Sequence, residues 1–366
     1  MRILFAAQID PEEAEAWLAA LQEAAPGHEW RVHGPRPGRD GGSQPSPASW
    51  PAGPLDPHPS SVQADVAVVA NPPAGVLAQA QGLKFIQSLW AGVDRLMADT
   101  TVPTDLPLAR MVDPSMTAAM VESALWAVTA LHRGFFDYAT QQRRAQWLQL
   151  PQRRADDIAV LVLGLGTMGA AVGAALAARG YRVAAWRRGA AGLAPPGVTV
   201  WQGHESPQGP GPARTRPPEG AQEYLGAAQR SPEGLNGLEA AVAQADVVLN
   251  LLPLTPHTRG LIDARFLSGM KPGAALVNFG RGGHVVEADL LAALEAGTLS
   301  RAVLDVFATE PLPPEHPFWR HPRVTVLPHV AALTDLRSAA AVVADNLARL
   351  QQGRPLLHLV DRQRGY

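Results

Sequence analysis

The sequence contains no cysteine and very little lysine. Without a thiol the chain can form no disulfide, no cysteine-ligated metal site and no thiolate nucleophile, and we expect no metal centre. Lys84 and Lys271 are the only lysines among the 31 basic residues, so the other 29 are arginines. Basic and acidic residues nearly balance at a net charge of −2, which gives no electrostatic reason to expect nucleic acid or a membrane surface as a partner.

The length of 366 residues is enough for two ordinary domains, and 46% hydrophobic residues are enough to give each of them a core. The N-terminal residues Met-Arg-Ile-Leu-Phe-Ala-Ala meet acidic residues again at Asp10 and Glu12, so they predict a strand and a helix rather than a secretion signal. We therefore expect a cytoplasmic protein.

One stretch without charge, residues 158–178, allows two interpretations. It could cross a membrane, and the spacing of Gly169 and Gly173 also occurs where membrane helices pack. Alternatively, residues 158–163 form a buried strand, the glycines that follow form a turn, and a helix comes next. A strand-like segment at 182–186 follows closely, which favours an order of strand, turn, helix and strand.

The turn has the spacing Gly164-x-Gly166-x-x-Gly169. Gly164 permits a tight turn, Gly166 lets the backbone approach a pyrophosphate, and Gly169 lets the helix pack on the strand. The residues after Met168 have helical composition, and the N-terminus of such a helix presents unpaired N–H groups to the anion. The pattern predicts a dinucleotide-binding site.

Apolar runs alternate with helical patterns along the chain, which predicts parallel strands joined by crossover helices. The first series has expected strands at 3–6, 66–70 and 83–89 and expected helices at 11–24 and 76–80. A long helix at about 116–138 separates it from the second series. The second series has expected strands at 157–163, 182–186, 198–201, 246–252, 274–279, 301–307 and 324–327, and a last helix follows at 335–351.

Two segments, residues 34–61 and 203–234, are rich in Pro, Gly, Ser and Arg and have no apolar periodicity. We expect flexible insertions there, with a lid or a partner-binding segment as the alternative. The remaining pattern predicts an α/β protein of two doubly wound lobes, with the second inserted into the first.

Three polar residues follow predicted strands of the second series, namely Arg281, Glu310 and His329. Ligands of open α/β sheets bind beyond the carboxyl ends of the strands. A carboxylate beside an imidazole favours its protonated form and fixes its orientation, which suits general acid–base catalysis near neutral pH. A guanidinium can hold a substrate carboxylate and polarise the adjacent carbonyl. The three together suit an α-keto acid that receives hydride from a nicotinamide. His284 also lies near Arg281 in the sequence, so it is an alternative to His329 as the acid–base residue.

Several motifs, in order along nearly the whole chain, resemble those of the D-isomer-specific 2-hydroxyacid dehydrogenases. They are Leu-Trp-Ala-Gly-Val-Asp at 89–94, the glycine turn at 164–169, Asn-Leu-Leu-Pro-Leu-Thr-Pro at 250–256, Asn-Phe-Gly-Arg-Gly at 278–282, Leu-Asp-Val-Phe at 304–307 with Glu-Pro-Leu at 310–312, and Pro-His-Val-Ala at 328–331. Within this family, Gly-His-Val-Val-Glu at 283–287, Pro-Leu-Pro-Pro-Glu at 311–315 and the terminal Val-Asp-Arg-x-Arg-Gly-Tyr are similar to the glyoxylate/hydroxypyruvate reductase A type. The two insertions have no counterpart in the family pattern.

The resemblance implies an α/β fold of two doubly wound parallel-sheet domains, one flavodoxin-like and one Rossmann, with the cleft between them. It places a discontinuous substrate-binding domain at 1–115 and 331–366 and an NAD(P)-binding domain at 116–330. It also implies that Arg281 binds the substrate carboxylate and carbonyl, that His329 donates the proton, and that Glu310 is the partner of His329.

The resemblance further implies that backbone N–H groups of Ala91 and Gly92 hold the substrate carboxylate. Trp90 stands where many relatives carry a smaller residue, so it bears on the size of the substrate pocket. The expected cofactor-binding residues are Gly164, Gly166, Thr167, Met168, Gly169, Arg187, Arg188, Leu252, Pro253, Asn278 and Asp305, with the last two near the nicotinamide. Plain turn chemistry for Gly92 and a structural strand-end carboxylate for Asp305 stay open as alternatives.

Charge at the end of the second Rossmann strand predicts the cofactor. A chain that prefers NAD usually carries Asp or Glu there, which accepts a hydrogen bond from the ribose 2′-OH. This chain has Arg187 and Arg188 at that place, and two guanidiniums favour a 2′-phosphate. We expect NADPH, with NADH as a weaker cofactor.

These expectations combine into NADPH-dependent reduction of glyoxylate or hydroxypyruvate, with a small 2-keto acid as the partner molecule. Another activity of the family, on phosphoglycerate or lactate, or a nucleotide-sensing corepressor on the same fold, remains an alternative. By resemblance we also expect a homodimer formed through the cofactor domain, with the loop that holds Trp147 near the active site of the partner.

Overall fold

The computed structural model describes residues 1–33, 62–189, 193–202 and 237–366, and the chain divides into two compact units. Unit 1 consists of Met1–Ala118 and Ala332–Tyr366, and unit 2 consists of Ala119–Ala331. The predicted domain boundaries differ from these by no more than three residues. The expected insertions, 34–61 and 203–234, lie outside the described residues.

Unit 1 is built on a five-stranded parallel sheet with the order β2-β1-β4-β6-β7. The strands are β1 (Arg2–Ala7), β2 (Glu29–His33), β4 (Val66–Ala70), β6 (Phe85–Ser88) and β7 (Leu108–Ala109), and β3 (Val62–Gln63) pairs separately with β5 (Ala80–Gln81). The central strand β4 reads Val-Ala-Val-Val-Ala and is buried along its whole length. A continuous apolar run of this kind is typical of a parallel strand that helices cover on both faces.

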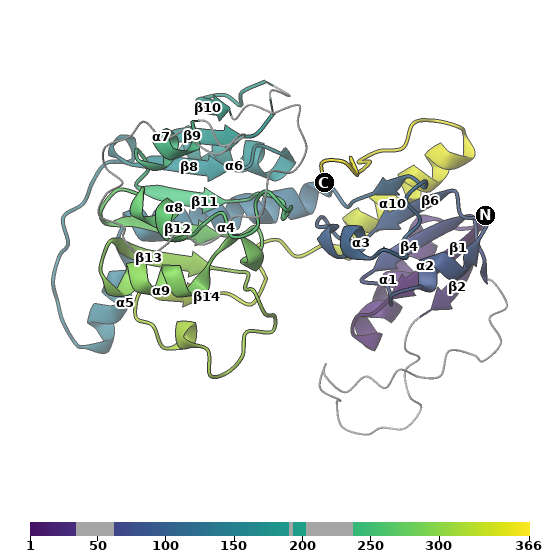
Figure 1. Cartoon of the computed structure of the whole chain (residues 1–366), viewed down its shortest axis with the longest axis horizontal. Helices are drawn as coiled ribbons and strands as arrows, with labels where there is room; N and C mark the ends of the chain where they lie inside the picture. The colour runs from purple at the N-terminus through teal and green to yellow at the C-terminus, as the bar shows by residue number, and fades with distance from the viewer. Residues whose placement is uncertain (34–61, 190–192, 203–236) are drawn as a thin grey trace, which may run out of the picture. The chain divides into compact units, whose positions relative to one another are not determined.

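The C-terminal helix of the chain returns to unit 1 and completes it (Figure 1). The helices of this unit are α1 (Pro11–Ala24), α2 (Val76–Gln79), α3 (Asp94–Ala98) and α10 (Leu336–Gln351). Helix α10 packs against α1, and Asn346 Nδ2 donates to Gln87 Oε1 of β6 at 2.8 Å, with both side chains fully buried. A satisfied buried amide pair of this kind fixes where the helix sits on the sheet.

Unit 2 is built on a seven-stranded parallel sheet with the order β10-β9-β8-β11-β12-β13-β14 (Figure 1). The strands are β8 (Ala159–Leu163), β9 (Arg182–Arg187), β10 (Val198–Gln202), β11 (Val247–Asn250), β12 (Ala274–Asn278), β13 (Leu299–Leu304) and β14 (Val324–Val326). From the neighbouring strands β8 and β11 the sheet continues in opposite directions, through β9 to β10 on one side and through β12 and β13 to β14 on the other. A doubly wound sheet has its ligand crevice at such a switch point, outside the carboxyl ends of the strands. The α/β fold of two parallel sheets predicted from the sequence is confirmed.

The helices of unit 2 are mostly short. They are α5 (Phe135–Arg143), α6 (Thr167–Ala178), α7 (Leu238–Val242), α8 (Ala264–Ser268) and α9 (Glu287–Glu295), with 3-10 turns η1 (Ala155–Asp157), η2 (Gly282–His284) and η3 (Pro317–Trp319). The uncharged residues 158–178 are divided between strand β8, the glycine turn and α6, so the alternative of a membrane helix was wrong for them. Within the described ranges, no helix has both the length and the apolar character needed to cross a bilayer.

The single helix expected at 116–138 is two helices. Helix α4 (Pro114–His132) runs from unit 1 into unit 2 and ends before Gly134, and α5 begins at Phe135. Gly134 has a φ of 69°, the left-handed conformation that interrupts a helix at little cost only in glycine. The helical pattern continues across the break, which is why the sequence did not reveal it.

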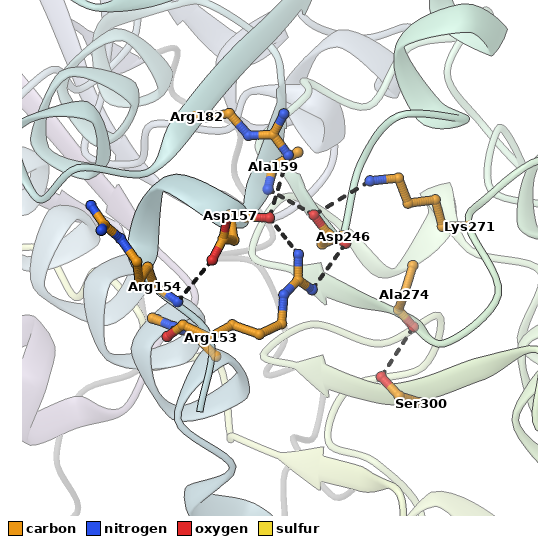
Figure 2. A network of polar contacts seen from close by, with 10 residues as sticks. Arg153, Arg154, Asp157, Ala159, Arg182, Asp246, Lys271, Ala274 and Ser300 are labelled. Atoms are coloured by element: carbon orange, nitrogen blue, oxygen red, sulfur yellow. Dashed lines mark hydrogen bonds and ion pairs between the residues drawn. The ribbon is translucent and has the colours of Figure 1, made fainter. Parts of the chain in front are cut away.

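The amino-terminal edge of the unit 2 sheet is held by a polar network around Asp246, the residue before β11 (Figure 2). Asp246 accepts a hydrogen bond from the backbone N–H of Ala159 at 2.8 Å and pairs with Lys271 and Arg153, each at 3.4 Å. Burial acts to raise the pKa of Asp246, but this N–H and the two cations together hold it below its usual value. The network fixes one edge of the sheet and lies opposite the carboxyl edge.

Candidate active site

The glycine turn joins β8 to α6 at the carboxyl edge of the unit 2 sheet. Gly164 has a φ of 96°, and a Cβ there would lie 2.9 Å from the carbonyl oxygen of Leu251. A Cβ on Gly169 would overlap the carbonyl oxygen of Gly164. Neither position accepts a side chain, so both glycines are required by the turn itself.

Gly166 differs from its two neighbours, because a Cβ there would meet no atom within 4 Å. It is the N-cap of α6, with no side-chain cap and no acidic residue in the first turn. Thr167 and Met168 are the first residues of this helix, so their N–H groups have no partner from a preceding turn. Open space in front of an uncapped, acid-free helix N-terminus fits the pyrophosphate of a dinucleotide.

Arg187 and Arg188 lie beside this turn. The carbonyl of Trp186 accepts a hydrogen bond from the N–H of Gly164 at 2.9 Å, and Arg187 follows as the last residue of β9. Both arginines are half-buried. On the other side of Gly164, Leu252 and Pro253 follow the end of β11. The structure thus brings these predicted cofactor residues to one end of neighbouring strands.

A buried polar cluster supports the turn that carries Arg281. Asn278 Oδ1 accepts from Asn250 Nδ2 at 2.9 Å and from the N–H of Gly280 at 3.2 Å. Asn278 Nδ2 donates to the carbonyl of Arg281 at 3.1 Å. The ends of β11 and β12 are therefore joined directly beneath Arg281. The amide of Asn278 supports the turn, and its predicted place near a nicotinamide stays a prediction.

His284 belongs to the same cluster and is fully buried. Its Nδ1 lies 3.2 Å from the backbone N–H of Arg281, which can only donate, so Nδ1 is an acceptor. Its Nε2 lies 3.2 Å from the carbonyl of Pro253, which can only accept, so Nε2 carries the proton. Both ring nitrogens are engaged within the fold, which argues against His284 as the competitor of His329.

Glu310 and His329 form a direct pair. Oε2 of Glu310 lies 2.8 Å from Nδ1 of His329, and Oε1 accepts from the N–H of Phe307 at 2.9 Å. Burial acts to raise the pKa of Glu310, but the hydrogen bonds from His329 and Phe307 and the charge of Arg281 hold it below its usual value. The His329 side chain is 51% exposed, so its ring can be reached from solvent.

The loop of His329 is fixed by Asp305, which directly follows β13. The two carboxylate oxygens of Asp305 accept from the N–H groups of Val330 at 2.7 Å and Ala331 at 3.0 Å. The N–H of His329 donates to the carbonyl of Asp305 at 2.9 Å, and His329 has a φ of 57°. A buried carboxylate thus holds the backbone around the imidazole, which is the structural role that stayed open as the alternative for Asp305.

The turn of Arg281 lies against the loop that leads to Glu310. A Cβ on Gly282 would overlap the backbone of Phe307 and Ala308, so only glycine allows this approach. The charge of Arg281 acts on Glu310, which in turn contacts His329. The structure therefore brings Arg281, Glu310 and His329 together at one end of the sheet. Gly282 is the last residue of the motif Asn-Phe-Gly-Arg-Gly, and the sequence did not reveal that it packs on this loop.

In unit 1, Trp90, Ala91 and Gly92 form the loop after β6. The indole ring of Trp90 packs edge-on against that of Trp17, with the ring centroids 6.0 Å apart. The carbonyl of Trp90 accepts from the N–H of Met111 at 3.0 Å. Within the described part of the chain, the N–H groups of Ala91 and Gly92 donate no hydrogen bond to protein atoms, so the loop offers two adjacent donors.

Comparison with known proteins gives the family. The model of the D-isomer specific 2-hydroxyacid dehydrogenase, NAD binding domain, matches residues 220–331. The glyoxylate/hydroxypyruvate reductase A of Serratia proteamaculans is 35% identical over 358 residues, which are 96% of this chain and 96% of that protein. The chain belongs to the D-isomer specific 2-hydroxyacid dehydrogenases. It is therefore an NAD(P)-dependent oxidoreductase, as its motifs predicted.

Solved structures of other 2-hydroxyacid dehydrogenases share the fold of this dehydrogenase along its length. The enzyme from Xanthobacter autotrophicus Py2, in complex with NADPH and MES, is 34% identical with a TM-score of 0.80, covering 100% of this chain and 99% of that one. The NADPH-dependent glyoxylate/hydroxypyruvate reductase from Sinorhizobium meliloti, in complex with NADP and sulfate, is 30% identical with a TM-score of 0.79, with the same coverage.

Proposed function

We propose that this dehydrogenase reduces glyoxylate or hydroxypyruvate to the 2-hydroxy acid, with NADPH as the cofactor and His329 as the proton donor. The observation that carries the proposal is the pair of Glu310 and His329, with Oε2 and Nδ1 2.8 Å apart and the charge of Arg281 acting on Glu310. The similarity to glyoxylate/hydroxypyruvate reductases from two organisms supports the choice of substrate.

Each of the predicted site residues would have one role in this reduction. Arg281 binds the substrate carboxylate and polarises the carbonyl through a guanidinium that matches both oxygens. The N–H groups of Ala91 and Gly92 are further donors for the carboxylate. A bound nicotinamide supplies the hydride. His329, oriented through Nδ1 by Glu310, donates a proton from Nε2 to the carbonyl oxygen. Unit 1 would then be the substrate-binding domain, and unit 2 the cofactor-binding domain.

Replacement of the imidazole tests the chemistry. His329→Ala should lower kcat by about 10²–10⁴-fold, the usual contribution of a positioned general acid, with little change in the Kd of NADPH. The control is His321→Ala, because His321 follows η3, is partly exposed and is none of the predicted site residues. A His329→Ala enzyme with wild-type kcat would remove the assignment.

The preference for NADPH rests on Arg187 and Arg188 at the end of β9. Both side chains start beside the turn of Gly164, where the ribose of a bound dinucleotide is expected, and no acid accompanies them. Arg187→Asp should lower kcat/KM for NADPH more than for NADH. A wild-type kcat/KM that is equal or higher with NADH would contradict the preference.

A homodimer through unit 2 is part of the proposal. Exposed aromatic and aliphatic side chains occur along α4, α5 and the residues after them: Trp126, Phe135, Trp147 and Leu148 are 45%, 54%, 96% and 63% exposed. A second copy of unit 2 would remove such side chains from water. Sedimentation of Trp147→Ser, with the equally exposed Leu193→Ser as control, tests this. A wild-type chain that sediments as a monomer would contradict it.

A further inference from the structure

Two neighbouring backbone amides after β13 are each held by a carboxylate. The N–H of Phe307 donates to Oε1 of Glu310 at 2.9 Å, and the N–H of Ala308 donates to Oε1 of Glu287 at 3.2 Å. Glu310 belongs to the proposed acid–base pair. Glu287 does not belong to that pair and comes from a different element, since it is the first residue of α9. The loop that carries Glu310 is thus anchored by a carboxylate from a separate element.

The second oxygen of Glu287 faces His316. Nδ1 of His316 lies 3.3 Å from the N–H of Phe318, which can only donate, so Nδ1 is an acceptor. The proton of the neutral ring is therefore on Nε2, which lies 3.5 Å from Oε2 of Glu287. The two side chains are only 19% and 25% exposed, so the contact is largely shielded from water. His316 thus lies against the carboxylate oxygen of Glu287 that does not bond Ala308.

The anchored backbone also supports the turn of Arg281. Gly282 approaches the backbone of Phe307 and Ala308 so closely that a side chain there would overlap it. A shift of Ala308 would therefore act in two directions, on the Arg281 turn and, through Phe307, on the carboxylate of Glu310. Three groups of the proposed reaction depend on the position of one short loop.

We propose that Glu287, held by His316, is a positioning residue for the Glu310–His329 pair. The proposal rests on the proposed function, because it assigns to Glu287 the orientation of that acid–base pair. It assigns a joint role to the last residue of Gly-His-Val-Val-Glu at 283–287 and to the histidine that follows Pro-Leu-Pro-Pro-Glu at 311–315. Glu287 acts through the backbone and touches no reacting atom.

Two substitutions of Glu287 separate its roles. Glu287→Gln keeps one oxygen as an acceptor for Ala308 and loses the charge, whereas Glu287→Ala loses both contacts. We expect kcat to fall by about tenfold in Glu287→Ala and less in Glu287→Gln, a part of the 10²–10⁴-fold effect of a positioned general acid. The KM for the keto acid and the Kd of NADPH should change less. The matched control is Glu295→Gln, at the exposed end of the same helix.

The pH profile distinguishes positioning from a merely structural role. The Glu310 carboxylate favours the imidazolium form, and a displaced carboxylate favours it less. The pH at which reduction falls to half on the alkaline side should therefore move to lower pH in Glu287→Ala. Loss of thermal stability alone would lower Tm and leave this midpoint unchanged.

His316 offers a second, independent pair of variants. Glutamine at 316 places an amide N–H near the position of Nε2 and can still donate to Glu287. Asparagine is an N-cap residue and can still accept from Phe318, but its short side chain does not extend to Glu287. We expect His316→Gln to keep the wild-type pH profile and His316→Asn to shift it as Glu287→Ala does.

The outcomes separate this proposal from the proposed function. Wild-type kcat and pH profile in Glu287→Ala, or a profile shift in His316→Gln without one in His316→Asn, would overturn the positioning role. If His329→Ala is inactive while Glu287→Ala behaves as wild type, only the positioning role is lost. If His329→Ala is fully active, the proposed function is lost first.

Discussion

Nδ1 of His329 lies 2.8 Å from Oε2 of Glu310, while the backbone N–H of His329 is held by the carbonyl of Asp305 at 2.9 Å. One residue thus orients the ring and the other fixes the backbone that carries it. The two roles are separable by substitution, because Glu310 bonds the ring of His329 whereas Asp305 bonds the backbone of His329, Val330 and Ala331.

Removal of the charge at position 310 should change the pH dependence of the reaction. In Glu310→Gln the neutral amide no longer favours a cation beside it, so we expect the alkaline midpoint of kcat/KM for reduction to move to lower pH. Because the pKa of Glu310 lies below its usual value of 4.5, the wild-type pair should stay intact as the pH falls to that value. Initial rates from pH 4 to 10 test both statements. An unchanged alkaline midpoint would contradict the pairing.

Removal of the acceptor at position 305 should cost both stability and activity. Asp305→Asn replaces one buried oxygen by an N–H₂ group that cannot accept from Val330 or Ala331. Loss of a hydrogen bond to a charged acceptor costs about 1.5–3 kcal/mol. Urea unfolding should show a loss of that size, and kcat should fall because the His329 loop is released. The exposed Asp105→Asn serves as control, and equal stability of the two variants would contradict this role.

The sequence predicted the centre of the site better than its supports. The strand, turn and helix around Gly164 were expected because the glycine spacing is a local pattern. The trio of Arg281, Glu310 and His329 was expected because each residue follows a predicted strand. The elements β2 and β7 were not expected, since β2 is mostly polar and β7 has two residues.

Tertiary contacts account for the remaining differences. His284 could be judged against His329 only once its ring was seen between Arg281 and Pro253. The contact of Glu287 with His316 joins residues whose approach depends on the path of β13 and the loop after it. No periodicity in the sequence carries such information, because these contacts are set by the packing of separate elements.

The ion pairs of Asp246 should make unit 2 sensitive to acid. The pKa of Asp246 is lowered in the folded chain, so its contribution to stability is present above the unfolded value, about 3.9, and is lost as the pH falls through the folded pKa. Asp246→Asn keeps an oxygen for the N–H of Ala159 but loses the attraction to Arg153 and Lys271. We expect a loss of about 1 kcal/mol at pH 7, as is typical of partly exposed pairs. Thermal melting should show this difference vanishing below about pH 4, and a difference that grows in acid would contradict it.

Two glycines of the turn should respond in opposite ways to the same methyl group. Alanine at 169 would overlap the carbonyl of Gly164, so Gly169→Ala should lower Tm by several degrees even without cofactor. Alanine at 166 meets no atom within 4 Å, so Gly166→Ala should keep the wild-type Tm. Its methyl group stands in front of the N-terminus of α6, where a pyrophosphate must approach the backbone, so the Kd of NADPH should rise by about tenfold or more. Fluorescence titration of the purified variants measures this. A Gly166→Ala chain that binds NADPH as wild type would place the dinucleotide elsewhere, whatever the effect at Gly169.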